Sequence, residues 1–236
     1  MKKAIFILMV LSLVFITACA EYKCRSVVDT NSRDDCYYGI AVEKSNPAIC
    51  SKVSSDVFKN SCYAEIAIAN NDMESCRAIE GKSGEYCTAK IAIAKKDSSL
   101  CEGLNTTYWS DICFKGIAEA GGNYEECAKV QNTKDSQDCY YNTAIAHLNY
   151  NICSNLKNET AHDKCIYQIG IATLNESICE ETKEILPGDV CILKIAKTKK
   201  DFNICSSISY FEIKDNCRKD IAEMYNRTVR EMIEED

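Results

Sequence analysis

The residues of this chain with the widest range of chemistry are its seventeen cysteines, because a thiol can bind a metal, act as a nucleophile or form a disulfide. From Cys24 onwards the intervals between them alternate between 12 and 14 residues, with a single interval of 11 between Cys76 and Cys87. Metal sites favour cysteine pairs separated by about two to four residues, and no such pair is present among the sixteen cysteines from Cys24 onwards. The spacing therefore predicts disulfides and no metal site.

Counting limits how these cysteines pair. If each pair spans the shorter interval, all sixteen are used, whereas pairing across the 14-residue interval leaves Cys24 and Cys217 alone at opposite ends of the pattern. Each cysteine then lies about one helical turn from the loop of an antiparallel helix pair, within the ~6 Å Cα separation of a disulfide. The predicted pairs, which leave no free thiol after residue 19, are Cys24–Cys36, Cys50–Cys62, Cys76–Cys87, Cys101–Cys113, Cys127–Cys139, Cys153–Cys165, Cys179–Cys191 and Cys205–Cys217.

Sequence motifs for other chemistry are missing, since the chain contains no nucleotide-binding loop and no HExxH, GxSxG or CxxCH motif. The only imidazoles belong to His147 and His162, and a Cys–His nucleophile pair would require a free thiol. We therefore expect both histidines to be solvated surface residues. The sequence predicts that the protein is not an enzyme and has no catalytic residue and no cofactor.

The cysteines belong to a repeat of 26 residues, shortened once to 25 between Cys62 and Cys87. Positions are numbered here from the second cysteine of each pair. Position +4 is Ile in seven of the eight repeats and position +5 is Ala in seven, as in Ile66 and Ala67. Together with the cysteine they fall on one face of a 3.6-residue helix. Each repeat is therefore predicted to contain a long helix, whose small +5 residue lets a neighbouring helix approach closely.

A second helix of two turns is predicted to begin at position +10, which is Asn or Asp in seven repeats. These side chains are preferred N-caps, and Pro47 follows one of them at N1. The seven residues are Asn46, Asp72, Asp97, Asn123, Asn149, Asn175 and Asp201. The first turn of the long helix often has an acid at position −2, where the helix dipole favours negative charge. These acids are Asp34, Glu85, Asp111, Asp163, Asp189 and Asp215.

The pattern predicts an all-α fold, a disulfide-stapled α-solenoid of about eight 26-residue helix-pair repeats. Its plan resembles that of Sel1-like and tetratricopeptide-like arrays, including secreted cysteine-rich ones, although their repeats are longer and their cysteine spacing differs. The resemblance is one of plan and implies protein or peptide binding, because stacked arrays present extended binding surfaces. Fold alone does not determine function.

The first residues predict an export signal, with a basic start at Met1-Lys2-Lys3 and an apolar run over 4–16. The segment Ile-Thr-Ala-Cys at 16–19 resembles the lipobox of prokaryotic lipoproteins, which implies that Cys19 carries a lipid. Two alternatives remain open: a cleavage site at 18–20 that releases a soluble protein, or an uncleaved, marginal anchor over 4–20. All three export the remainder, so we expect an extracytoplasmic protein, membrane-anchored at the cell surface or in the periplasm, with an export signal over 1–19 and one repeat domain over 20–236.

Surface composition bears on the partners. The formal net charge is −7 and no basic stripe is present, which argues against nucleic acid as a partner. The lipid anchor would associate the chain with a membrane, and the predicted partner is an envelope or extracellular protein or peptide. Four N-glycosylation sequons offer modification sites, at Asn105, Asn158, Asn175 and Asn226.

Position +3 of the long helix varies most and lies opposite the apolar face, so it is expected to be exposed. The residues that make it a candidate binding face are Glu65, Lys90, Asn142, Gln168 and Lys194. Either this column is merely solvated, or it forms a binding surface that differs from repeat to repeat. Three functions remain: an interaction scaffold, which the sequence favours, a passive envelope spacer, and an enzyme with an unrecognised site.

Overall fold

The computed structural model describes residues 22–121 and 123–234, with side chains up to Tyr225, and these residues form helices and turns without a strand. The chain divides into two compact units, the first ending at Cys113 and the second beginning at Phe114. Each unit is described by itself. The predicted export signal, with Cys19, lies outside the described residues, so the lipid anchor and the domain boundaries stay predictions.

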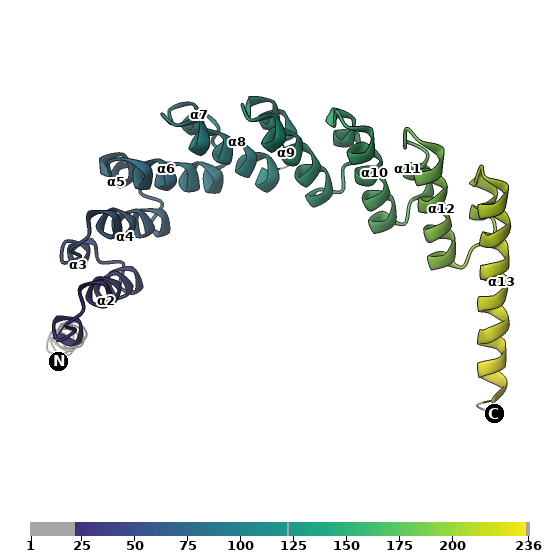
Figure 1. Cartoon of the computed structure of the whole chain (residues 1–236), viewed down its shortest axis with the longest axis horizontal. Helices are drawn as coiled ribbons and strands as arrows, with labels where there is room; N and C mark the ends of the chain where they lie inside the picture. Colours follow the sequence, from purple (N-terminus) through teal and green to yellow (C-terminus); the bar gives the residue numbers. More distant parts are fainter. Residues whose placement is uncertain (1–21, 122, 235–236) are drawn as a thin grey trace, which may run out of the picture. The chain divides into compact units, whose positions relative to one another are not determined.

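One long helix per repeat is present, as predicted. In the first unit the long helices α2, α4 and α6 lie side by side, and in the second unit α9, α10, α12 and α13 do (Figure 1). The boundary between the units falls within α8. The bounds of the long helices are α2 (Thr30–Glu43), α4 (Asp56–Ala69), α6 (Lys82–Lys95), α8 (Thr107–Gly121), α9 (Thr133–Ala146), α10 (Glu159–Thr173), α12 (Ile185–Lys199) and α13 (Phe211–Glu234).

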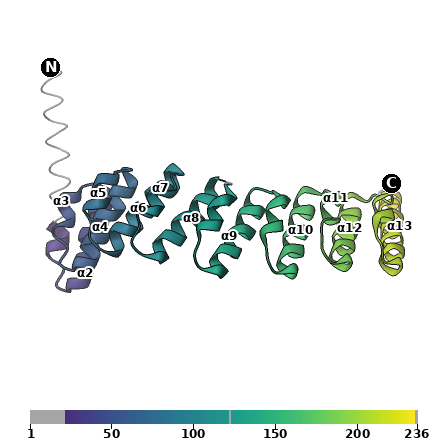
Figure 2. The same cartoon turned by 90° about the horizontal axis from the view of Figure 1, so that it is seen from above.

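The second helix of each repeat has four to six residues, which is one to two turns, and in three repeats it is a 3-10 helix. Its last turn is tight because an apolar residue three positions after the cysteine donates its N–H to the cysteine carbonyl, as Val130 does to Cys127 at 3.4 Å. In the first unit, α3 and α5 lie on the same side of the α2 and α4 row (Figure 2). The short helices are α3 (Pro47–Cys50), α5 (Met73–Ala78), α7 (Ser99–Glu102), η1 (Tyr124–Lys129), η2 (Tyr150–Asn155), α11 (Glu176–Cys179) and η3 (Ile204–Ser207).

The turn between the two helices has the same geometry in six repeats, although it lacks glycine. Position +9 has a positive φ in all six, for example 55° at Lys96 and 50° at Leu174. The next N–H then donates to the +5 carbonyl, as Asn175 does to Gly170 at 3.0 Å, which is the hydrogen bond of a Schellman motif. The +10 side chain immediately caps the short helix, and the Asn46 carboxamide oxygen accepts the Ala48 N–H at 3.1 Å.

Position +10 is the N-cap in five repeats, as predicted, while in the other two the short helix begins slightly later. The Asp97 carboxylate accepts the Ser99 N–H at 3.1 Å, and the Asp201 carboxylate accepts the Asn203 N–H at 2.8 Å. In these two repeats the helix has Ser98 or Asn203 at its N-cap. The local hydrogen bond of the aspartate is thus retained even where the helix starts later.

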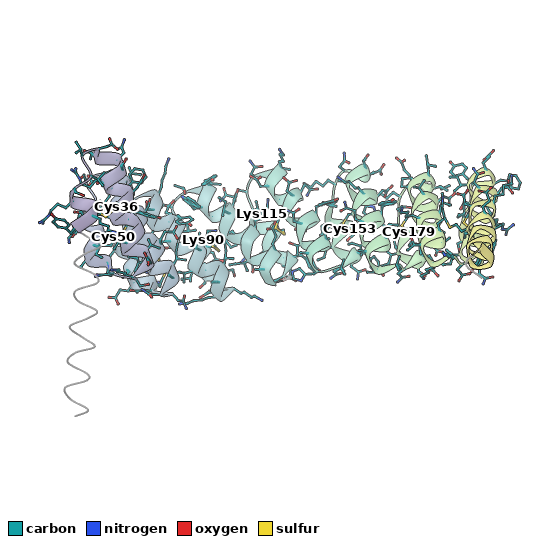
Figure 3. All side chains as sticks on the ribbon, turned by 90° about the horizontal axis from the view of Figure 1, so that it is seen from below. Cys36, Cys50, Lys90, Lys115, Cys153 and Cys179 are labelled. Carbon is teal, nitrogen blue, oxygen red and sulfur yellow. A yellow bond between two sulfur atoms is a disulfide. The ribbon has the colours of Figure 1, made fainter. Side chains whose placement is uncertain are left out.

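Eight disulfides staple the helix pairs, and they are the same pairs that the spacing predicts. Their Cα–Cα distances range from 5.4 Å for Cys76–Cys87 to 5.9 Å for Cys153–Cys165. Fifteen of the sixteen disulfide-bonded cysteines are buried, and Cys36 is partly buried. Figure 3 labels Cys153 and Cys179, which belong to successive pairs of the second unit. The seven bonds from Cys50–Cys62 onwards each join a short helix to the long helix that follows it, and the buried sulfur atoms lie within the apolar layers.

The Cys179–Cys191 disulfide packs against the small +5 residue of the preceding long helix. A Cβ added to Gly170 would lie 3.0 Å from both sulfur atoms of Cys179–Cys191, closer than ordinary van der Waals contact. In the other repeats this position is Ala, and Ala41, Ala92 and Ala144 are fully buried. The +5 residues are therefore small because the next staple occupies the space beside them.

In four repeats the acid at position −2 has a different role from the one expected, because it accepts N–H groups from the loop that leads to the next long helix. The Asp34 carboxylate accepts the N–H groups of Ser54 and Ser55, both at 2.9 Å, in the loop that leads to the next long helix. Asp163 binds the N–H groups of Lys183 and Glu184 in the same way. Asp34 and Asp163 are buried rather than placed at a solvated helix end. These carboxylates provide buried acceptors for backbone donors that would otherwise remain unpaired.

Hydrogen bonding also lowers the pKa of these carboxyl groups. For Asp34, the Ser54 N–H holds the pKa below its ordinary value, against the opposing effect of burial. For Asp163, burial acts to raise the pKa, but the hydrogen bonds from His162 and from the loop N–H groups outweigh it, and the net shift is downward. Both carboxyl groups are therefore stabilised in their charged form.

His162 is buried, so the expectation that it is a solvated surface residue is wrong. Its Nδ1 donates to the Asp163 carboxylate at 2.9 Å, and its side chain lies within the first turns of α10. The reason is that the neighbouring acid is itself buried between two repeats. His147 is exposed, as expected, and its Nε2 lies 2.8 Å from the carbonyl oxygen of Glu119.

Candidate binding surface

The +3 column is only partly the solvated face that the sequence predicts. Lys90, Asn142, Gln168 and Lys194 are exposed, whereas Glu65 is partly buried. Of the remaining members of the column, Gly39 is exposed and Gly116 and Asp220 are partly buried. The role of this column as a binding face stays a prediction.

Several +3 side chains contact the preceding or following long helix. Tyr86 donates its hydroxyl to the Glu65 carboxylate at 3.1 Å, and Tyr141 donates to the Gln168 side-chain oxygen at 2.7 Å. The Asn142 amide donates to the Glu119 carboxylate at 2.9 Å. These contacts link neighbouring repeats, so they account for Glu65, Asn142 and Gln168 without a partner molecule.

The two lysines of the column differ in their surroundings. The Lys90 ammonium group lies 5.7 Å from the centre of the Tyr86 ring, within the range of a cation–π contact (Lys90 is labelled in Figure 3). The Lys194 ammonium group has no hydrogen bond or ion pair to any residue in 22–121 and 123–225. Lys194 instead borders a groove in the second unit.

This groove has a volume of about 320 Å³ and lies between α10, α12 and α13. Its apolar walls are formed by Tyr167 from α10, Val190 and Leu193 from α12, and Met224 from α13. Tyr167 and Leu193 also pack against the core of the last two repeats. Since these side chains belong to packed helices, the groove is formed by the fold of the unit itself.

Charge at the groove is supplied by α12. Lys194 and Lys197 border it. Lys197 forms an ion pair with Asp220 at 2.7 Å, and Lys199, further along the helix, forms one with Glu176 at 3.0 Å. These ion pairs are partly exposed and therefore contribute little to stability. An apolar surface next to a lysine without an acidic partner suits a ligand with both apolar and acidic groups.

Two hollows in the first unit are larger, and in each of them a carboxylate accepts backbone N–H groups. The first, of about 460 Å³, lies beside α5 and α7, where the Glu85 carboxylate accepts the N–H groups of Asn105 and Thr106 at 3.1 and 3.2 Å. The second, of about 380 Å³, includes Asp72, which accepts the N–H groups of Glu74 and Ser75. These carboxylates support the backbone, so the groove at α12 is the stronger candidate.

Three of the four predicted glycosylation sites lie at helix starts or in loops. Asn105, Asn158 and Asn175 are exposed. Asn158 and Asn175 are N-caps whose side-chain oxygens accept the N–H groups of Ala161 at 2.9 Å and Ser177 at 3.1 Å. The Asn226 side chain lies outside the described residues. Modification of any of the four stays a prediction.

Comparisons of the chain with protein-family models, with characterised proteins and with solved structures find no match. The fold itself shows a disulfide-rich helical repeat protein. Eight disulfides indicate an oxidising, extracytoplasmic environment, since cytosolic thiols are kept reduced. Among the described residues, none of the helices has the length and apolar character to cross a membrane.

Proposed function

We propose that this protein is an extracytoplasmic interaction scaffold, tethered by a lipid on Cys19, that binds a protein or peptide through the second unit. The observation that carries the proposal is the groove between α10, α12 and α13, where Lys194 of the variable +3 column stands next to the apolar side chains of Val190 and Leu193. A passive spacer has no need of such a surface, because exposed apolar residues favour unwanted association. Binding rather than catalysis is proposed, since the groove contains no nucleophile paired with a base.

Site-specific photo-crosslinking in intact producing cells tests this proposal. A photoreactive residue replaces Thr198, which borders the groove, and a matched control replaces Ala94, which is exposed at the same +7 position of α6. We expect Thr198 to give a discrete crosslinked protein or peptide and Ala94 to give none. The spacer interpretation would be correct if neither position gives a product, or if both give the same products in the same yield.

A further inference from the structure

The exposed face of α12 continues beyond the groove and changes character along its length. Leu186, Val190, Leu193 and Lys197 follow each other at intervals of four, three and four residues, so they lie on one face of the helix. Leu186 and Val190 are 53% and 39% exposed, which is unusual for large apolar side chains on adjacent turns. The face is therefore apolar in its first half and basic in its second.

The start of α13 is held beside the first turns of α12. The Asp189 carboxylate accepts the N–H groups of Ser209 at 2.8 Å and Tyr210 at 2.7 Å, which fixes this loop against α12. Asp189 stands directly before Val190, so Tyr210 and the following Phe211 belong to the same end of the unit. Phe211 is 76% exposed. Three large apolar side chains at two neighbouring helix starts thus remain open to a partner.

The basic half is specific to this repeat. Position +6 is Ile or Val in five repeats, and at α12 it is Lys197. Four lysines, at 194, 197, 199 and 200, fall within the last seven residues of this segment, although the chain as a whole has a net charge of −7. Position −1, where α12 has Val190, is polar in most other repeats. The combination distinguishes this surface from the repeating framework.

We propose that the α12 face binds an acidic amphipathic helix of a partner protein, with its apolar stripe on Leu186, Val190 and Leu193 and its carboxylates near Lys194. The distance from Leu186 to Lys197 corresponds to about three helical turns, or roughly 17 Å, so a partner helix of about 11 or 12 residues covers it. Apolar anchors at such intervals are typical of helix-in-groove recognition. The inference rests on the proposed function and adds the chemistry of the partner.

Two synthetic probes test the charge complementarity. The acidic probe is a fluorescein-labelled helical peptide of roughly 14 residues with Leu at i, i+3, i+4 and i+7 and Glu on the flanks of that stripe, and the basic probe has Lys in place of each Glu. Fluorescence anisotropy is measured with the oxidised protein. We expect saturable binding of the acidic probe that weakens as salt is added, and at least about tenfold weaker binding of the basic probe.

Matched variants locate the binding. Lys194→Glu should lower the affinity for the acidic probe by about tenfold, and Val190→Asp should lower it as well. Lys90→Glu in the first unit should leave the affinity unchanged. All three residues are exposed, and an unchanged circular dichroism spectrum checks the fold. The inference is wrong if the acidic probe fails to bind, if Lys194→Glu binds it normally, or if the basic probe binds equally well. If any of these results is obtained while a photoreactive residue at position 198 still crosslinks a partner in cells, the scaffold function stands. Only the proposal that the partner helix is acidic is then rejected.

Discussion

Complete reduction and alkylation of the eight disulfides is expected to abolish the cooperative helical structure of this protein. Each bond closes a loop of about 13 residues and contributes roughly 3 kcal/mol in the chain-entropy model. The short helices have only four to six residues, so they are too short to be stable without tertiary support. Far-ultraviolet circular dichroism before and after reduction measures the loss. An unchanged spectrum and melting temperature would show that packing alone holds the helix pairs.

A single-staple variant separates local from global effects. Replacing both Cys101 and Cys113 with Ser removes one bond and leaves no unpaired thiol. We expect a loss of about 3 kcal/mol in the first unit, measured by urea unfolding, while the remaining seven pairs stay oxidised. The matched single variant Cys101→Ser should be no more stable than the double variant, and it leaves Cys113 free to exchange with neighbouring disulfides.

Removing the Asp34 carboxylate should uncouple the first two described repeats. Asp34→Ala leaves the Ser54 and Ser55 N–H groups without their acceptor, and we expect unfolding free energy to fall by about 1–3 kcal/mol. Asp35→Ala is a matched control, since Asp35 is the adjacent acid of α2 and is exposed. It should change stability by no more than about 0.5 kcal/mol. Equal effects of the two variants would show that the inter-repeat hydrogen bonds contribute nothing.

The same contact predicts how stability depends on pH. The pKa of Asp34 is lowered in the folded protein, chiefly by the Ser54 N–H, so its contribution is present above the ordinary carboxyl pKa and is lost as pH falls through the folded value. Asp163 acts in the same direction, its lowered pKa reflecting hydrogen bonds that outweigh burial. Below about pH 4 the wild-type protein should therefore lose stability more steeply than Asp34→Ala.

The regular features of the fold were predictable because every repeat imposes the same constraint on the same position. Cysteine intervals determined the pairing, and the Ile and Ala columns at +4 and +5 determined the buried face of the long helix. The Asn or Asp at +10 indicated where each short helix begins. Its length was overestimated in the four repeats where it has only four residues, because nothing in the sequence shows that the N–H three residues after the cysteine closes the last turn on the cysteine carbonyl.

Contacts between repeats were much harder to predict. An acid at −2 is explained by the helix dipole as well as by a contact with the next repeat. Only the fold shows that the Asp34 carboxylate accepts N–H groups 20 and 21 positions away. His162 is buried for the same reason. The positive φ at Lys96 and Leu174 has no sequence signal, since glycine is the residue usually found there. The only sequence signal for the hydrogen bonds between repeats was the recurrence of acids at −2.

The candidate surface was predictable in part. Variation at +3 indicated Lys194 as a candidate binding residue. Glu65, Asn142 and Gln168 of the same column instead contact neighbouring repeats. The repeat pattern does not single out Leu186 and Val190, because no one residue type recurs at their positions. A search for apolar residues at positions that are usually polar would have found Val190.

Tryptic peptide mapping of the unreduced protein by mass spectrometry tests the stapled-repeat architecture most directly. Between Cys24 and Cys62 the lysines and arginines separate the cysteines into different peptides. The fold predicts that peptide 34–44, with Cys36, is joined to 24–25, and that peptide 45–52, with Cys50, is joined to 60–77, which in turn holds 83–90 through Cys76 and Cys87. A bond between 34–44 and 45–52, which joins Cys36 to Cys50, would contradict the helix-pair staples on which the whole account depends.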